Sequence, residues 1–391
     1  MTRTMLLVFL LVVAVKATLS PARHSVYPEY ADAGRDIWAD EPLGFVARQY
    51  LPYFSIAMTP LAVLPERLGC MLWTVLQLLI YFTGLRAFQR AFVPRQQVAT
   101  FLAVSLLVGL SSLWNQQANT FIIGCLLWGS VALVRQRWWL AALCLGLPAF
   151  KLYPLALGLV YAVFAPRLAW RLALVVLALV LLPILFLGLE ATWTRYAWIA
   201  EYAAEGVHSV RFNLVGVREL LARHGYDFEM RSFFWIQAFT GALIPLLLLV
   251  SSPENRVRAA FLLTSLWFVT FGPSVEAQTY LLAAPALGLL LAQAQQRGAW
   301  LSWGFLLGVV LVAGPAQTSL LGSEMQRWLA QAKPACVLLT LVWLWQLLVC
   351  LSEATTNPLK STKKRATEAR SNHGTHRSTE TAMIAECRSF H

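Results

Sequence analysis

The stretch LALVVLALVLLPILFLGL at residues 172–189 decides the fold class, because it contains no charged side chain. A helix that crosses a bilayer needs about 20 predominantly apolar residues. Apolar runs near this length recur along the chain, without the alternation of polar and apolar residues found in strands of a membrane barrel. Since a spanning segment must satisfy its own backbone hydrogen bonds, the sequence predicts an all-α, polytopic membrane protein.

The composition agrees with this prediction and excludes an ordinary soluble domain. Of the 391 residues, 58% are hydrophobic and 13% are charged, whereas a soluble domain carries about 25% charged residues. Much of the formal net charge of +12 lies in the C-terminal tail and in short loops, so it does not indicate nucleic-acid binding. Five of the six cysteines lie inside apolar runs, and we expect neither a disulfide framework nor a thiolate metal site.

Loop charge predicts the orientation of about 10–12 helices. Basic residues gather in alternate connections, such as the one that holds Arg256 and Arg258, and these connections are expected to face the cytoplasm. The other connections then face outward, including the first outer loop at 21–55 and a long loop at 190–232. Both termini are expected inside, in a cytoplasmic (inner) membrane of bacterial type.

The chain divides into a membrane domain and a tail. Residues 1–352 hold all the apolar runs, and the first of them, which ends near Leu19, is expected to remain as an uncleaved helix. Residues 353–391 are polar and basic, with too few large apolar groups to form a core. We predict a disordered cytoplasmic tail whose lysines lie on anionic lipid.

Three apolar segments are too short for an ordinary crossing. Residues 138–149 and 153–165 meet at Phe150–Pro154, and we predict two tilted or partly re-entrant helices that meet near the outer leaflet. The proline-rich segment 51–64 is predicted as a re-entrant or interfacial helix at the end of the first outer loop.

The first outer loop, PARHSVYPEYADAGRDIWADEPLGFVARQYLPYFS at 21–55, gathers acidic residues among tyrosines. If its middle is helical, Glu29, Asp32 and Asp36 fall at i, i+3 and i+7 on one face. One of them would then be placed to act as general base on an acceptor hydroxyl, with Asp32 and Asp36 as the leading candidates and Glu29 third. The alternative is an interfacial helix with a solvated acidic face and aromatic residues such as Tyr30 against lipid.

Lys151 and Arg48 are the candidates for holding a phosphate. A lysine in an apolar span costs about 2.5–3.5 kcal/mol to insert, and Lys151 lies beside a Tyr-Pro break that would open the backbone. Arg48 lies close to two tyrosines in the first outer loop. The plainer alternatives are a helix-end lysine that extends to the outer headgroups and a salt bridge at the rim for Arg48.

Further polar residues gather on the outward side, where they would line one cavity. Amide side chains suit sugar hydroxyls because they both donate and accept hydrogen bonds, although Asn119 could instead cap a helix. A carboxylate at the membrane edge, as at Glu276, indicates function. The predicted substrate-binding residues are Tyr50, Tyr53, Asn115, Gln116, Asn119, Tyr153, Asn213 and Glu276. The sequence has no phosphate-cradling glycine loop and no zinc-binding spacing, so no cofactor is predicted, and a divalent metal is left open.

The order of these motifs resembles glycosyltransferase family 87. The resemblance rests on Tyr50-Leu51-Pro52-Tyr53, Asn115-Gln116-Gln117-Ala118-Asn119 and Lys151-Leu152-Tyr153-Pro154. This family consists of GT-C-type membrane enzymes, typified by polyprenol-phosphate-mannose-dependent α-mannosyltransferases. The resemblance implies a polyprenyl-phosphate sugar donor, an acceptor outside the cytoplasmic membrane and an inverting displacement. It also implies a first-loop carboxylate as base and basic residues that hold the departing phosphate.

Two differences from the family pattern bear on the base. Members often carry Asp shortly before the Val-Tyr pair, where this chain has Arg23-His24-Ser25, and His near the position of Gln278-Thr279. The first difference moves the base onto one of the three first-loop carboxylates. The second makes Glu276 a possible substitute for the histidine.

We therefore predict a mannosyltransferase-like membrane enzyme whose partners are a polyprenyl-phosphate sugar, a lipid or glycan acceptor and membrane lipids. The alternative is a transporter or flippase for a lipid-linked saccharide, with the same outer cavity. A transporter should carry polar groups through to the cytoplasmic side. The inner connections are instead short and basic, and this one-sidedness favours the enzyme.

Overall fold

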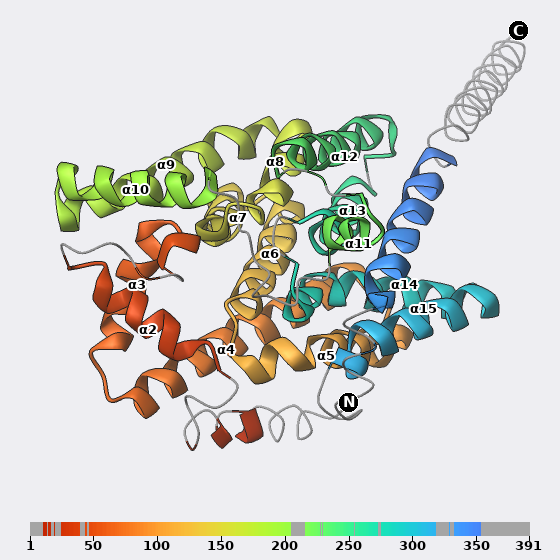
Figure 1. The fold of residues 1–391 in the computed structure, drawn as a ribbon. Helices are drawn as coiled ribbons and strands as arrows, with labels where there is room; N and C mark the ends of the chain where they lie inside the picture. Colours follow the sequence, from red (N-terminus) through yellow and green to blue (C-terminus); the bar gives the residue numbers. More distant parts are fainter. Residues whose placement is uncertain are drawn as a thin grey trace, which may run out of the picture.

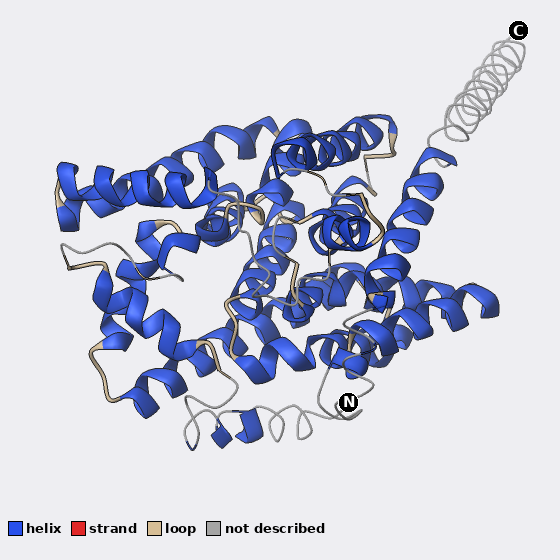
Figure 2. Ribbon diagram, in the orientation of Figure 1, coloured by secondary structure: helices blue, strands red, loops and turns tan. Residues whose placement is uncertain are grey.

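The described part of the chain is helical and contains no strand (Figure 2). The computed structural model describes residues 11–13, 15–16, 19, 25–39, 44, 47–204, 216–226, 228, 230–253, 255–272, 275–317, 328 and 332–352. The predicted all-α class is confirmed. The predicted tail at 353–391 lies outside the described residues.

Six helices in these ranges are long and apolar enough to cross a membrane, which confirms the prediction of a polytopic membrane protein. They are Glu66–Phe92 (α4), Arg95–Asn115 (η2 with α5), Pro166–Leu187 (α9), Ser232–Leu249 (within α12), Ala277–Gln296 (η4 with α14) and Pro334–Ser352. The shorter apolar helices are Asn119–Val134 (α6), Trp138–Lys151 (α7 with η3), Leu155–Phe164 (α8) and Trp300–Ala313 (α15).

The remaining helices complete the bundle in Figure 1. They are Tyr27–Asp36 (α2), Ala47–Gln49 (η1), Pro52–Ala62 (α3), Leu189–Ala204 (α10), Val217–Arg223 (α11), Met230–Val250 (α12), Arg256–Phe271 (α13) and Pro315–Gln317 (η5). The segment predicted as a long loop at 190–232 therefore carries α10 and α11. Helix α6 lies in the centre of the bundle, and most of its residues are buried.

Two glycines let α4 and α6 approach closely. A Cβ added at Gly124 would lie 2.8 Å from the backbone carbon of Ile80, and one at Gly84 would lie 2.7 Å from the carbonyl oxygen of Gly124. Small residues of this kind allow helices to pack closely within a bilayer, where burial of apolar surface gives no driving force. The crossing matters for function because α6 begins at Asn119, in the polar turn singled out from the sequence.

Replacing Gly124 with valine is expected to lower the melting temperature of the purified protein in detergent. The added atoms must push α4 away from α6, and such overpacking costs about 1–3 kcal/mol. Gly308→Val in α15 is the matched control, because no atom lies within 4 Å of a Cβ added there. Equal shifts for the two variants would show that the α4–α6 crossing is not tightly packed.

The first outer loop and the segment that follows it contribute a pair of helices, α2 and α3, that cross at Gly34. A Cβ at Gly34 would lie 3.0 Å from the backbone nitrogen of Thr59, whose hydroxyl donates to the Gly34 carbonyl over 2.9 Å. The helix predicted in this loop is present. Tyr30 is only 2% exposed, and its ring packs on Phe54 and Trp73. The alternative that placed Tyr30 against lipid is therefore wrong.

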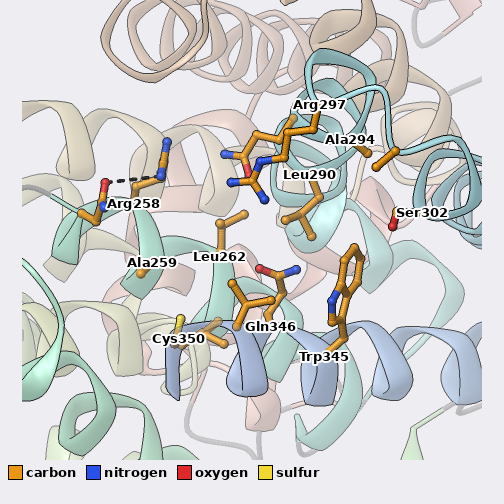
Figure 3. A pocket seen from close by; sticks show the side chains of 15 residues that line it. Arg258, Ala259, Leu262, Leu290, Ala294, Arg297, Ser302, Trp345, Gln346 and Cys350 are labelled. Atoms are coloured by element: carbon orange, nitrogen blue, oxygen red, sulfur yellow. Dashed lines mark hydrogen bonds between the residues drawn. The ribbon is translucent and has the colours of Figure 1, made fainter. Parts of the chain in front are cut away.

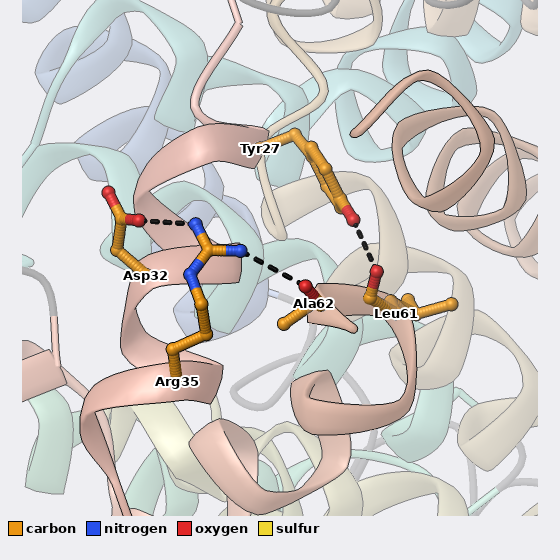
Figure 4. A network of polar contacts seen from close by, with 5 residues as sticks. All are labelled: Tyr27, Asp32, Arg35, Leu61 and Ala62. Carbon is orange, nitrogen blue, oxygen red and sulfur yellow. Dashed lines mark hydrogen bonds and ion pairs between the residues drawn. The ribbon is translucent and has the colours of Figure 1, made fainter. Parts of the chain in front are cut away.

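Side chains of α2 bind the free carbonyl groups at the end of α3 (Figure 4). The Tyr27 hydroxyl donates to the Leu61 carbonyl over 2.9 Å, and the Arg35 guanidinium donates to the Ala62 carbonyl over 3.0 Å. Asp32 in turn pairs with Arg35. These bonds satisfy acceptors that a helix C-terminus leaves without intrahelical partners.

The predicted interruption near Lys151 is present. Helix α7 ends at Gly146, a 3-10 turn follows over Leu147–Lys151 (η3), and α8 begins at Leu155. Leu152 has a φ of 61°, which a side chain other than glycine rarely adopts. The chain therefore turns sharply immediately after the lysine.

Candidate active site

A continuous chain of hydrogen bonds joins three parts of the bundle that are far apart in sequence. The Gln117 amide donates to a carboxylate oxygen of Glu276 over 2.8 Å, and the Asn119 amide donates to the Gln117 side-chain oxygen over 2.7 Å. Lys151 Nζ donates to Asn119 Oδ1 over 3.1 Å. We refer to Glu276, Gln117, Asn119 and Lys151 as the polar chain. Three of its four residues were predicted from the sequence, and Gln117 was missed.

Three tyrosines surround the lysine end of the polar chain. The Tyr153 hydroxyl lies 3.4 Å from Asn119 Oδ1, and the Lys151 ammonium lies 5.4 Å from the ring centroid of Tyr50. The Tyr50 hydroxyl is 3.4 Å from that of Tyr30, which accepts a hydrogen bond from the Ala118 backbone over 3.1 Å. Tyr30 therefore links α2 to the same turn that supplies the amides. Its role was not predicted.

The turn between α5 and α6 orients the side chains of Gln117 and Asn119. Gln116 adopts a left-handed conformation in this turn, with φ of 58°. Its carbonyl accepts hydrogen bonds from Trp73 Nε1 over 3.1 Å and from Gln77 Nε2 over 3.0 Å. Its side-chain oxygen accepts from the Ser25 hydroxyl. The structure thus places Gln116 in the scaffold of the turn and outside the polar chain.

Asn119 does not cap α6. The N-cap is Ala118, and no side chain caps the helix there. The Asn119 side chain instead donates a hydrogen bond to Gln117 and accepts one from Lys151. Both of its functional groups are therefore occupied in holding the polar chain together.

Glu276 is held in place by a capping box at the start of η4. Its side chain accepts from the Thr279 backbone, and the Thr279 hydroxyl accepts from the Glu276 backbone over 3.1 Å. On the other side of the site, the Leu51 backbone donates to the Phe150 carbonyl over 2.9 Å, and the Tyr53 hydroxyl donates to the Leu147 carbonyl over 2.9 Å. These bonds fix α3 against η3, so Tyr53 has a scaffold contact.

Among the three first-loop carboxylates, Glu29 lies closest to the polar chain. Tyr30 faces the site, and on a helix Glu29 is 100° from it, whereas Asp32 is about 160° away and Asp36 lies more than a turn further along. Partial burial of its carboxylate raises the pKa of Glu29, and the nearby charges of Glu276 and Asp32 raise it further. Asp32 instead pairs with Arg35, with 62% of its side chain exposed.

A buried arginine from α10 holds the end of α2. Arg195 is 3% exposed, and it donates to the Ile37 carbonyl over 2.8 Å and to the Ala39 carbonyl over 2.7 Å. It thereby positions the helix that carries Glu29. This residue was missed from the sequence, although an arginine inside the apolar stretch TWTRYAW was a signal that could have marked it.

The other predicted residues lie around this centre or outside the described ranges. Arg48 lies in η1, two residues before Tyr50, and is partly exposed. The Asn115 carbonyl accepts from the Val26 backbone over 3.2 Å, which ties α2 to the end of α5. Asn213 lies outside the described residues. Within the described ranges, no three His, Cys, Asp or Glu side chains are grouped closely enough to hold a metal ion.

The arrangement has the parts for moving a proton beside a bound anion. The Lys151 ammonium has three N–H groups, of which one donates to Asn119. Within the described residues no carboxylate forms a salt bridge with it, since the one such pair joins Arg35 to Asp32. Lys151 therefore has no ion-pair partner among the described residues, although the carboxylate of Glu276 lies close by.

Comparison with known sequences points in the same direction. The model of glycosyltransferase family 87 matches residues 49–285, which is more than half of the chain. The matched range includes the whole polar chain and begins after α2. No curated protein sequence matches this chain.

Proposed function

The chain belongs to glycosyltransferase family 87, and from this premise we propose that it moves mannose from a polyprenyl-phosphate donor to a lipid or glycan acceptor. Membership of the family, together with the apolar helices, makes the protein a membrane glycosyltransferase. The observation that supports the lipid-phosphate donor is the ammonium of Lys151, which lies at a break between two apolar helices and has no carboxylate partner among the described residues.

In the proposed reaction Lys151 binds the phosphate that links the sugar to its lipid, and Tyr153 and Tyr50 border it. Glu29 accepts the proton of an acceptor hydroxyl as that oxygen attacks the anomeric carbon. The bond between this carbon and the phosphate oxygen breaks with inversion, and polyprenyl phosphate leaves with the bonding electron pair. Lysine stabilises the charge that develops on the leaving phosphate. The reaction needs no group beyond donor and acceptor to balance.

The polar chain lies at the end of the bundle opposite to a group of arginines. Helix α13 begins at Arg256, close to Arg258, and ends at Phe271, shortly before Glu276. A helix of 16 residues is about 24 Å long. Since basic ends face the cytoplasm, this separation supports a site that opens to the outer leaflet, as the loop charges predict.

The test is transfer by the purified protein in detergent, with radiolabelled polyprenyl-phosphate mannose and a membrane lipid extract. We expect a new labelled glycolipid or glycan, and no product from a nucleotide-linked mannose. The same donor in sealed vesicles tests the transporter alternative. Movement of the donor across the bilayer without a new glycosidic bond would contradict the proposed reaction.

The pH dependence of transfer should report on Glu29. The base must be ionised, so kcat/KM falls as the pH drops through its pKa. Burial and neighbouring charges raise the pKa of Glu29. The acid limb of the pH profile should therefore lie above about pH 4.3, where an ordinary glutamate would place it. Glu276→Gln removes one of these charges and should shift the limb to lower pH. Glu66→Gln, at the start of α4, is the control and should leave it in place.

A further inference from the structure

A polar cavity lies away from the polar chain, near the basic end of α13. Its volume is about 90 Å³, several times the ~10–15 Å³ that one water needs. It is bordered by α13, the end of α14, the start of α15 and the helix Pro334–Ser352 (Figure 3). The proposed transfer reaction makes no use of it.

Two arginines from different helices line this cavity, and no acidic side chain among the described residues does. Arg258 belongs to α13, and Arg297 follows the last residue of α14. Arg258 donates one hydrogen bond to the Asn255 side chain, over 3.3 Å. Arg297 makes no side-chain hydrogen bond to the described residues. Because no acidic side chain of the described residues offsets the two positive charges in this lining, the cavity favours an anion.

A buried amide completes the lining. Gln346 is 7% exposed, and it makes no side-chain hydrogen bond within the described part of the chain. In Figure 3 the side chains of Arg297 and Gln346 point into the cavity from opposite walls, beside Trp345. The amide of Gln346 is therefore open to the cavity. A ligand that accepts hydrogen bonds from the guanidinium groups could also accept one from this amide.

We propose that this cavity binds a phosphate group, as the head of a membrane lipid or as a free phosphate ester. Guanidinium groups bind phosphate through paired, charge-assisted hydrogen bonds. The apolar side chains of Leu262 and Leu290, and the ring of Trp345, form part of the wall and suit the glycerol and acyl portion of a lipid. A bound phosphate would join α13, α14 and the helix Pro334–Ser352. This assignment does not rest on the proposed transfer reaction.

Binding is tested on the full chain purified in a neutral detergent. One probe is dioleoyl-phosphatidylglycerol in mixed micelles, followed by native mass spectrometry. Dioleoyl-phosphatidylcholine, whose phosphate is neutralised by its own choline group, is the comparison with zero net charge. The other probe is radiolabelled inorganic phosphate in equilibrium dialysis. We expect saturable binding of one probe, weakened about tenfold or more by the double substitution Arg258→Gln with Arg297→Gln.

The matched control is Arg135→Gln with Arg137→Gln, which removes two exposed arginines from another basic connection. This pair should change the affinity less than about twofold, because neither arginine lines the cavity and both contribute only screened, long-range attraction. Binding of dioleoyl-phosphatidylglycerol identifies the ligand as a lipid headgroup. Binding of inorganic phosphate alone identifies the ligand as a soluble phosphate. The assignment would be overturned if neither probe bound saturably. It would also be overturned if the two double variants lost equal amounts of binding affinity.

Ligand binding should also raise the melting temperature of the wild-type protein, since a ligand that binds only the folded state stabilises it. The Arg258 and Arg297 double variant should melt close to wild type without ligand, because neither arginine forms a salt bridge with the described residues. It should gain little on addition of the lipid. A variant that melts lower without ligand but gains as much as wild type would contradict the site.

Discussion

Replacing Glu29 with glutamine is expected to lower kcat for sugar transfer by about 10²–10⁴-fold, the usual contribution of a positioned general base. The amide has nearly the same shape as the carboxylate but cannot accept the hydroxyl proton. Glu29 lies on the side of α2 next to Tyr30, which contacts the turn that carries the amides, and Glu276 is close enough to raise its pKa. The measurement is single-turnover transfer from labelled polyprenyl-phosphate mannose.

The neighbouring carboxylates provide the controls. Asp32→Asn loses the ion pair to Arg35 on an exposed face, so kcat should change by less than about tenfold. Asp36→Asn, about two turns along α2 from Glu29, should behave in the same way. If either aspartate variant loses more activity than Glu29→Gln, the base has been assigned to the wrong residue. Unchanged α2 packing in all three variants can be checked from their melting temperatures.

The sequence was sufficient for the fold class because a bilayer imposes simple rules. A run such as 172–189 can satisfy its backbone groups only as a helix, and it forms most of α9. The break after Lys151 was also predictable, since the apolar segments around it are short and Pro154 follows. Both features depend only on the residues within a short stretch of chain, so they can be predicted from local sequence.

The contacts that build the site could not be predicted in this way. Gln117 meets Glu276 across 159 positions of sequence, and Arg195 reaches Ile37 across 158. Helical periodicity predicts three carboxylates on one face of α2. It does not predict which end of that face lies against the rest of the protein. The close contact at Gly34 and the bond from the Ala118 backbone to Tyr30 set this orientation. Tertiary packing therefore changes the order of the candidates.

Replacing Lys151 with methionine is expected to lower kcat/KM for the donor by about 10–100-fold, and to leave the KM of the acceptor nearly unchanged. A hydrogen bond to a charged group contributes about 1.5–3 kcal/mol, and 1.4 kcal/mol corresponds to a factor of ten. Methionine keeps most of the length and the apolar stem of the side chain beside Tyr50. The loss of kcat/KM therefore measures the contribution of the ammonium group. Initial rates at varied donor and acceptor concentrations separate the two effects.

Lys16→Met is the control, because the Lys16 ammonium also lies beside an aromatic ring but does not belong to the polar chain. Its ammonium donates to the Trp114 carbonyl over 3.1 Å and lies 5.4 Å from the Trp114 ring centroid, the same separation as between Lys151 and Tyr50. Losing a lysine beside an aromatic ring is thus common to both variants, and any shared effect measures packing. The donor-specific loss should appear only at position 151. A larger effect on the acceptor than on the donor there would place the sugar acceptor, and not the lipid phosphate, beside this lysine.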